Sequence, residues 1–110
     1  MATPAPTRDT IHHPQVDALD LAQILRTVGD PLRLAMVRTL AAEDELLCGA
    51  LGERLGLPKS TGSYHLRLLR EAGITRTRQE GTLRFVSLRR GELERRYPGL
   101  VDVLVAGEPG

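Results

Sequence analysis

Short hydrogen-bonding side chains gather in one segment of this 110-residue chain, where they can meet a polar partner. The segment reads STGSYHLRLLREAG over residues 60–73, and its first half holds two serines, a threonine, a tyrosine and a histidine. A solvated helix face normally uses Lys and Glu, because Ser and Thr are weaker helix formers and Gly costs about 1 kcal/mol relative to Ala. Short hydroxyl side chains, by contrast, let a helix end approach closely and hydrogen-bond to base edges or phosphates. The segment therefore favours nucleic-acid binding, with a polar first turn of a purely structural helix as the alternative.

The spacing of small and apolar residues places this segment on a helix with two distinct faces. Gly62, Leu66 and Leu69 recur at steps of four and three residues, so they form an inward stripe. The opposite face and its flanks carry the polar residues Ser60, Thr61, Ser63, Tyr64, Arg67 and Glu71. The free amides and the positive dipole end at the start of such a helix also favour a phosphate.

The chain contains few residues that could form a metal site or a catalytic centre. Cys48 is the only cysteine, which excludes an internal disulfide and fits a reducing compartment. One thiolate cannot supply the three or four ligands of a soft-metal site, so no metal or other cofactor is expected. A metal- or thiol-responsive site in which His12 and His13 join Cys48 across a dimer is kept as an alternative. No Ser/His/Asp or Cys/His set has convincing placement, so the chain is not expected to be an enzyme.

Charge is divided sharply along the chain, although the net charge is only +1. Residues 59–96 carry a balance of +6, whereas the remaining residues carry −5. The basic part is expected to face a polyanion, and a solvated charged surface is the alternative. Apolar residues make up 41% of the chain and aromatic residues only 3%, which predicts a single domain with an aliphatic core. No apolar run reaches the roughly 20 residues of a membrane span and no signal-peptide core is visible, so a cytoplasmic location is expected.

The N-terminal part of the chain predicts an arm followed by two helices. Residues 1–15 contain three prolines and little to bury, so they are expected to form a disordered arm. One domain is expected over residues 16–106, with a short tail over residues 107–110. Helical periodicity runs from Val16 to Gly29, and Asp30-Pro31 then begins a second helix as an N-cap and first-turn pair.

The middle of the chain predicts a helix-turn-helix unit followed by a hairpin. A short helix over Leu47–Leu55 and the turn Gly56-Leu57-Pro58 precede the polar helix. Residues 74–79 and 82–88 alternate in polarity around a two-residue turn at Glu80-Gly81, which indicates an Arg-rich β-hairpin. The expected fold class is therefore mainly α with a small β-hairpin (α+β).

The first and last helices carry more apolar residues than a lone domain of this size can cover. The last helix is expected over Gly91–Ala106, with an interruption at Pro98. An uncovered apolar patch marks an interface, so both helices are expected to form a homodimer. The residues expected at this interface are Leu21, Ile24, Leu25, Leu93, Leu100, Val103 and Leu104.

Three motifs of the chain resemble the winged helix-turn-helix domain of the ArsR family of bacterial transcriptional repressors. VGDPLRLAMVRTLA resembles the opening helix pair, usually written A-L-x-D-P-x-R-x-x-I-L-x-x-L. LGLPKSTGSYHLRLLREAGI resembles the recognition segment, L-G-L-S-x-S-T-V-S-x-H-L-x-x-L-x-x-A-G-L, and TRTRQEGTLRFVSL resembles the wing. The match covers residues 25–88 and implies a homodimer on double-stranded DNA, with its two recognition helices in successive major grooves of a two-fold symmetric operator.

The resemblance implies a role in DNA binding for residues of the polar helix and of the hairpin. The positions that it aligns with the major groove are Lys59, Ser60, Thr61, Ser63 and Tyr64, with Arg67 on the same outward face. His65 matches the family's histidine and is expected to orient the helix or contact a phosphate rather than read a base. Arg78 and Arg84 are expected to contact phosphate or the minor groove from the hairpin. Gly62 stands where the family usually has Val or Ala, which predicts closer packing of the two motif helices.

The chain departs from the family where many members bind a metal or respond to an oxidant. The family pattern E-L-C-V-C-D corresponds here to DELLCGAL, in which Leu47 and Gly49 take the two cysteine positions. The last helix, which holds the other common site, contains no histidine. We therefore expect a DNA-binding regulator of the repressor type whose inducer is not a metal at these sites, and a small-molecule or protein effector stays open. A winged-helix interaction module without DNA binding, or one that binds RNA, is the alternative.

Overall fold

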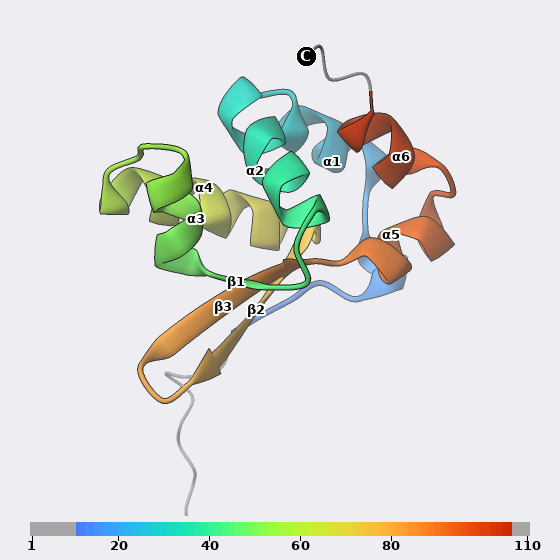
Figure 1. Ribbon diagram of the computed structural model, residues 1–110. Coiled ribbons are helices and arrows are strands. Elements are labelled where there is room, and N and C mark those ends of the chain that lie inside the picture. Colours follow the sequence, from blue (N-terminus) through green and yellow to red (C-terminus); the bar gives the residue numbers. More distant parts are fainter. Residues whose placement is uncertain (1–10, 107–110) are drawn as a thin grey trace, which may run out of the picture.

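The computed structural model describes residues 11–106, which form a body of helices with one projecting hairpin (Figure 1). In chain order the elements are the 3-10 helix η2 (Val16–Ala18), α1 (Leu21–Val28), α2 (Pro31–Ala41), β1 (Leu46–Leu47), α3 (Cys48–Arg54), α4 (Lys59–Glu71), β2 (Thr75–Glu80), β3 (Leu83–Leu88), α5 (Arg90–Arg96) and α6 (Leu100–Val105). Helices α3 and α4 lie at one end of the body, and α5 and α6 lie at the other (Figure 1). The mainly α fold with a small β-hairpin is confirmed.

Aspartate side chains start the first two helices. The Asp20 carboxylate accepts a hydrogen bond from the Gln23 amide at 3.0 Å at the start of α1. The Asp30 carboxylate accepts from the amides of Leu32 and Arg33 at 2.8 and 3.1 Å. These hydrogen bonds, with that of Arg33 the strongest influence, lower the pKa of the Asp30 carboxyl. The expected start of the second helix is thus confirmed.

The first helix begins later than its periodicity suggests. Val16 lies in η2, and the chain is extended at Leu19 before α1 begins at Leu21. Leu19 is only 2% exposed, so its side chain belongs to the core. Its carbonyl oxygen accepts a hydrogen bond from the Tyr97 hydroxyl at 3.1 Å. Because both contacts hold Leu19 out of a helical position, one continuous helix from Val16 does not form.

The sheet has three antiparallel strands in the order β1-β3-β2. Strand β2 pairs with β3 from Thr75 opposite Leu88 to Glu80 opposite Leu83. Glu80 therefore lies in the ladder, and the turn is one residue later than expected, at Gly81-Thr82. Gly81 has a φ of +63°, which a glycine adopts without strain at such a turn.

The sequence pattern does not predict strand β1. Leu46 and Leu47 pair with Val86 and Phe85, whereas a helix is expected from Leu47. Helix α3 begins at Cys48 instead. Two residues are too few to show the alternation of a strand, and this pairing arises because the outer edge of β3 offers unpaired backbone groups.

An aliphatic core joins the helices to the base of the hairpin, as the composition predicts. Its most deeply buried side chains are Ile24, Met36, Val37, Leu40, Leu51, Leu69, Ile74, Val86, Leu93 and Val101. Three residues expected at the dimer interface, Ile24, Leu93 and Leu104, belong to this core, with exposed fractions of 0%, 0% and 8%. Their side chains are covered by the chain itself, so their assignment to the dimer interface is corrected.

The C-terminal region is divided into two short helices, which confirms the interruption expected at Pro98. Gly99 has a φ of +89° between the two helices. Its amide donates to the Glu94 carboxylate at 3.1 Å, and this hydrogen bond stabilises the turn between α5 and α6. Arg38 of α2 donates from Nε to the Leu104 carbonyl at 2.9 Å, so α6 is fastened to the body.

Residues 11–15, which the sequence assigns to a disordered arm, lie beside β2 in the structure (Figure 1). Nε2 of His13 accepts a hydrogen bond from the backbone amide of Thr77 at 3.0 Å. Because β2 is an edge strand, this contact supplies an acceptor that a neighbouring strand would otherwise provide. Residues 1–10 of the expected arm and the tail over 107–110 lie outside the described residues. Within residues 11–106, no helix is long and apolar enough to cross a membrane.

Candidate nucleic-acid interface

Helix α4 separates a buried stripe from an exposed polar face, as the spacing of its residues predicts. Gly62, Leu66 and Leu69 are buried. The exposed residues are Lys59, Ser60, Ser63, Tyr64, Arg67 and Glu71. Thr61 and His65 are half-buried between the two faces. The N-terminal half of α4 therefore presents hydroxyl and cationic groups together on one accessible surface.

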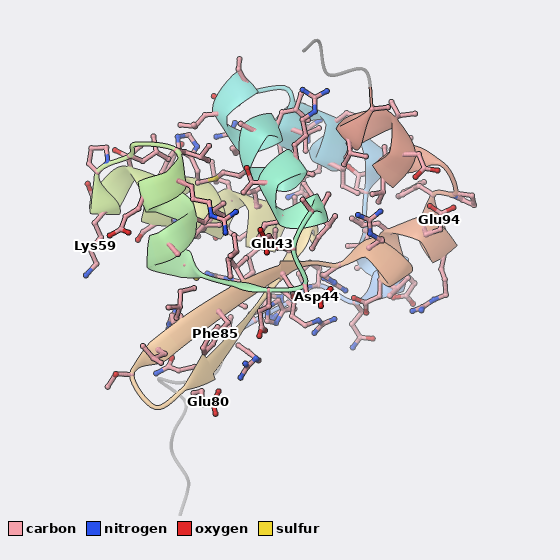
Figure 2. The ribbon with its side chains drawn as sticks, viewed as in Figure 1. Glu43, Asp44, Lys59, Glu80, Phe85 and Glu94 are labelled. Carbon is pink, nitrogen blue, oxygen red and sulfur yellow. The ribbon has the colours of Figure 1, made fainter. Side chains whose placement is uncertain are left out.

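The N-terminal end of α4 is suited to an anion. Pro58 occupies the N-cap position and gives the first amides of the helix no side-chain acceptor. The Lys59 side chain extends away from the body at this end (Figure 2). Free amides, the helix dipole and the Lys59 ammonium together favour a phosphate at this position.

Two glycines allow α3 and α4 to approach closely. Gly52 and Gly62 are both buried, and a Cβ atom placed on Gly62 would lie 3.8 Å from the Cα of Gly52. The helices thus meet here without a side chain between them, although the distance would also admit the Cβ atom of an alanine. The turn that joins them contains Gly56, whose φ is +69°.

His65 connects α4 to the start of α2. Its Nδ1 lies 3.0 Å from Nη1 of Arg33, and Nε of Arg33 donates to the Thr27 carbonyl at 2.7 Å. A guanidinium group can only donate, so Nδ1 accepts and the ring proton lies on Nε2. Sequence reasoning missed Arg33, although it occupies the arginine position of the D-P-x-R motif. The contact links the middle of α4 to the first turn of α2.

Tyr64 stands on the exposed face of α4 and is held by its neighbours. The rings of Tyr64 and His65 meet edge-on with their centroids 5.1 Å apart. The guanidinium carbon of Arg67 lies 5.6 Å from the centroid of the Tyr64 ring. Tyr64 nevertheless remains 49% exposed, so much of its side chain is available to a ligand.

Arg78 of the hairpin is engaged by the chain's own carboxylates. Its guanidinium donates to Glu45 at 2.8 and 2.9 Å and to Glu80 at 2.9 Å. It also lies over the Phe85 ring, 4.4 Å from the centroid. The hydrogen bonds to Glu45 and then Glu80 raise the pKa of Arg78, and the two carboxylates offset its charge. Arg78 is thus already paired at an exposed position of the hairpin, and its contact with phosphate or the minor groove stays a prediction.

Arg84 is the more accessible arginine of the hairpin. Its Nε donates to the neutral Oε1 of Gln79 at 3.1 Å, and its side chain is exposed. Arg84, Lys59 and Ser63 line one open cavity of about 810 Å³ between α3, α4 and the hairpin. This arrangement brings two expected cations to the walls of one groove, which suits the phosphate backbone of a nucleic acid.

Cys48 lies half-buried on the wall of the same cavity. Burial raises the pKa of its thiol, which lowers the fraction of reactive thiolate at neutral pH. Among residues 11–106, no group of three or more His, Cys, Asp or Glu side chains is placed to hold a metal ion. His13 lies at the base of the hairpin, where it accepts from the Thr77 amide. Cys48 and His13 therefore lie at different hollows of the chain.

The adjoining α3 and α4 with the hairpin beside them define a winged helix-turn-helix protein, a class of DNA-binding transcriptional regulators. Residues 28–78 match a family model described as a helix-turn-helix domain. The chain is 43% identical over 84 residues to YceK, an HTH-type transcriptional regulator of Bacillus subtilis, covering 76% of this chain and 84% of the relative. The chain belongs to the ArsR family of winged helix-turn-helix transcriptional regulators.

Two further proteins show the same relationship. The biofilm growth-associated repressor of Agrobacterium fabrum is 35% identical over 91 residues, which are 83% of this chain and 77% of the relative. A solution structure from Mycobacterium bovis describes a homodimeric winged helix-turn-helix DNA-binding domain of a possible ArsR-family regulator. It superposes with a TM-score of 0.65 at 25% identity and covers 76% of each chain.

Proposed function

We propose that this protein regulates transcription as a homodimer that reads a two-fold symmetric operator with the N-terminal half of α4. The observation that carries this proposal is the exposed polar face of that half-helix, opposite a fully buried stripe. Short hydroxyl groups on this face can reach base edges in the major groove, where each base pair presents a distinct pattern. The residues assigned to the groove are Lys59, Ser60, Thr61, Ser63, Tyr64 and Arg67.

His65 is assigned a positioning role in this proposal. Its Nδ1 is engaged by Arg33, so the imidazole sets the orientation of α4 before DNA is bound. The N–H at Nε2 is a donor of the kind that contacts a backbone phosphate. His65 therefore supports the register of the helix and carries no sequence information of its own.

Phosphate contacts are assigned to both sides of the cavity between α4 and the hairpin. Lys59 lies at one wall and Arg84 at another, and both side chains are exposed. Arg78, which pairs with Glu45 and Glu80 at an exposed position of the hairpin, is assigned to phosphate or the minor groove as well. Contacts of this kind supply affinity for any duplex, whereas discrimination comes from base edges.

The homodimer is proposed to form through apolar side chains of α1 and α6. Leu21, Leu25 and Val103 are 38%, 48% and 72% exposed, and Leu100 is half-buried. The Tyr97 hydroxyl accepts from the Leu21 amide at 3.1 Å, which holds the start of α1 against the C-terminal region. An exposed apolar surface of this kind favours self-association through a two-fold axis. The homodimeric mycobacterial relative supports this arrangement.

We infer that the protein is a repressor that acts in the cytoplasm. The Agrobacterium relative is named as a repressor, which supports this direction of control. A dimer of this kind responds to an effector, either a small molecule or a protein, that changes its affinity for the operator.

Selection of bound fragments from random duplex DNA, followed by sequencing, tests the proposal. The enriched fragments should share a two-fold symmetric site whose half-sites lie about 10 base pairs, or a multiple of that, apart. Binding without any shared sequence would contradict a sequence-specific regulator. A single unpaired half-site would contradict the dimer.

A further inference from the structure

A second polar hollow lies at the base of the hairpin, and α4 does not line it. Its volume of about 450 Å³ is in the range of small-molecule sites, and it opens between residues 13–17, β2 and the start of α5. The charged and titratable side chains that line it are His13, Asp17, Arg76, Arg89 and Glu92. Three separate parts of the chain thus bring five such groups to one place.

Arg89 is a buried charge in this lining, with only 4% of the residue exposed. Its Nε donates to Oε1 of Glu92 at 2.7 Å. Its Nη1 is also buried but has no hydrogen-bond partner among residues 11–106. An unpaired donor on a buried charged group is destabilising, so an acceptor that reached Nη1 from the hollow would stabilise the folded chain.

Beside Arg89, one carboxylate serves two guanidinium groups. Oε1 of Glu92 accepts from Nη2 of Arg76 at 2.7 Å in addition to its bond with Arg89. The hydrogen bonds from Arg89 and Arg76 lower the pKa of Glu92 to about 2. Glu92 therefore remains ionised at neutral pH and is shared by both arginines. Burial lowers the pKa of His13, and Arg76, Arg89 and Arg70 lower it further. The guanidinium groups that share Glu92 therefore give this wall hydrogen-bond donors for an anion, although Asp17 and Glu92 balance their charge over the lining as a whole.

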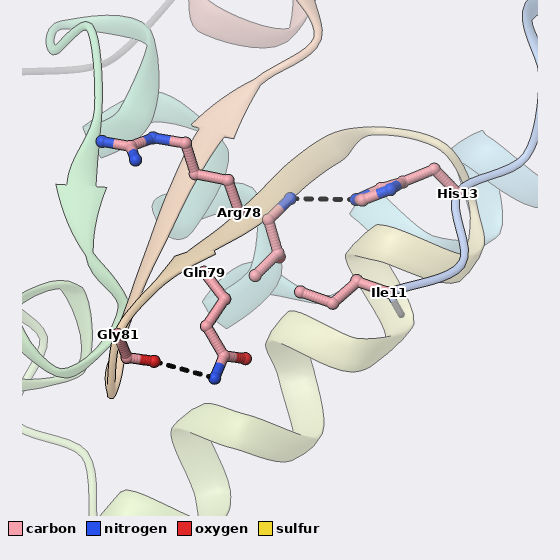
Figure 3. A pocket seen from close by; sticks show the side chains of 6 residues that line it. Ile11, His13, Arg78, Gln79 and Gly81 are labelled. Atoms are coloured by element: carbon pink, nitrogen blue, oxygen red, sulfur yellow. Dashed lines mark hydrogen bonds between the residues drawn. The ribbon is translucent and has the colours of Figure 1, made fainter. Parts of the chain in front are cut away.

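The remaining donors are suited to an oxyanion. Nε2 of His13 accepts from the Thr77 amide (Figure 3), so the neutral ring carries its proton on Nδ1 and can donate there. The Arg76 side chain is 47% exposed and bonds to Glu92 through Nη2, which leaves it accessible to a ligand. A guanidinium group can donate two parallel N–H hydrogen bonds, whose spacing matches two oxygens of a carboxylate or a phosphate.

We propose that this hollow binds the carboxylate or phosphate group of a small metabolite. The guanidinium groups of Arg89 and Arg76 hold the oxygens of the anion, and the His13 ring adds a third donor. Asp17 and Glu92 also line the hollow, so the anionic group has to be compact to stay clear of their charges.

The position of the hollow gives such a ligand a route to regulation. Arg76 belongs to the hairpin, whereas Arg89 connects β3 to α5 and Glu92 lies in α5. A ligand held across this joint fixes the hairpin relative to the C-terminal helices and thereby changes the affinity for DNA. This regulatory step rests on the proposed function, whereas anion binding itself does not.

Titration of the full-length protein with sodium phosphate, and separately with sodium acetate, tests the site at an ionic strength held constant with sodium chloride. The NMR shifts of the Thr77, Arg89 and Glu92 amides report binding in the absence of DNA. Arg76→Gln should weaken binding by about tenfold or more, because it removes one charge-assisted contact from an exposed position. Arg95→Gln makes the same charge change at an exposed position of α5 outside the hollow, and should leave the affinity unchanged.

Saturable shifts that weaken in Arg76→Gln and persist in Arg95→Gln would support the site. Saturation by phosphate alone or by acetate alone would identify the class of anion. Shifts that do not saturate, or that both variants change equally, would show an adventitious ion only and overturn the proposal. Saturable binding that leaves the operator affinity unchanged would support the site and overturn its regulatory role.

Discussion

Gly62 and Gly73 of the α4 region differ in whether their positions require glycine. Gly62 lies inside α4, where a Cβ atom would meet the Cα of Gly52 at 3.8 Å. Gly73 follows the end of α4 with a φ of +81°, and a Cβ atom there would collide with the Leu19 side chain. Only the second position requires glycine, because other residues adopt this left-handed conformation at a cost.

Gly62→Ala is expected to raise the free energy of unfolding by up to about 1 kcal/mol, because alanine is the better helix former. Its Cβ would lie at ordinary van der Waals distance from Gly52. Gly73→Ala is the control at the other end of α4 and should lower the free energy of unfolding by more than about 1 kcal/mol. Urea unfolding measures both variants, and a large loss in Gly62→Ala would contradict the helix contact described.

The exposed face of α4 could be predicted from sequence, but the partners of its residues could not. The stripe of Gly62, Leu66 and Leu69 is a property of one helix, so local spacing reveals it. The hydrogen bond between Arg33 and His65 joins positions 32 residues apart, and no local pattern encodes it. The pairing of Arg78 with its carboxylates depends in the same way on how the hairpin meets the loop before β1.

At the level of elements, residues 11–15 close the free edge of β2 through His13. The His13 ring must be neutral, with no proton on Nε2, to accept from the Thr77 amide. Burial and the positive charge of Arg76 lower the pKa of His13 below its usual 6.5. The folded state therefore binds fewer protons than the unfolded state, so the stabilisation by this contact is fully present above pH 6.5 and is lost as the pH falls through the lower pKa of the folded state.

Hydrogen exchange of the Thr77 amide tests this contact. After correction for the intrinsic pH dependence of exchange, protection should fall as His13 becomes protonated. His13→Ala should lose the protection and its pH dependence, because the acceptor is gone. His12→Ala removes the adjacent exposed histidine and should leave protection unchanged. Protection that survives in His13→Ala would contradict the role of this ring.

Glu92 joins β2 to α5 by accepting from Arg76 and Arg89. Glu92→Gln is expected to lower the free energy of unfolding by about 1–3 kcal/mol at neutral pH, because the buried Arg89 loses its carboxylate. The pKa of Glu92 falls from 4.5 to about 2 on folding. The stabilisation is therefore present above pH 4.5 and is lost as the pH falls towards 2.

Unfolding curves of the wild type and Glu92→Gln should thus converge at low pH. Glu80→Gln is the matched control, because its ion pair with Arg78 is exposed on the hairpin and contributes little. Equal losses in Glu92→Gln and Glu80→Gln would contradict a structural role for the carboxylate at the base of the hairpin.

Elements with their own start signals were predictable, whereas those that depend on distant contacts were not. Asp30-Pro31 marks the start of α2 because capping is a local interaction. Leu46 and Leu47 form a strand only because β3 lies beside them. The break at Leu19 likewise depends on Tyr97, which lies 78 positions away.

At the level of the whole molecule, composition indicates surplus apolar surface without showing which residues remain uncovered. The fold buries Ile24 and Leu93 in the chain's own core, and leaves Leu21, Leu25 and Val103 exposed. A self-associating surface can therefore include the second set but not the first. This distinction needs tertiary structure, because all five residues fit the same helical apolar pattern.

Val103→Glu is expected to give monomers at micromolar concentration, because it places a charge in the proposed homodimer interface. Val103 is 72% exposed in the single chain, so the fold should be retained. Leu83→Glu introduces the same charge at the end of the hairpin, where the residue is 50% exposed, and should leave dimers intact. Sedimentation velocity distinguishes the two states, and an intact Val103→Glu dimer would contradict the α1–α6 interface.

In the proposed complex, the exposed face of α4 discriminates between DNA sequences, and the hairpin adds affinity for any duplex. Ser60 and Tyr64 lie on the exposed face of α4, whereas Arg84 lies on the hairpin. Base-edge contacts discriminate between sequences, and phosphate contacts respond to salt. Loss of each kind of contact therefore leaves a different signature in binding measurements.

The most direct test is the affinity of the wild type, Ser60→Ala, Tyr64→Ala and Arg84→Ala for the selected operator and for an unrelated duplex, at several salt concentrations. Ser60→Ala and Tyr64→Ala should each cost about 1–3 kcal/mol on the operator and much less on unrelated DNA. Arg84→Ala should weaken both complexes alike and reduce the salt dependence by about one phosphate contact. Equal losses on both duplexes for Ser60→Ala and Tyr64→Ala would make these residues backbone contacts, and would contradict the reading of sequence by the N-terminal half of α4.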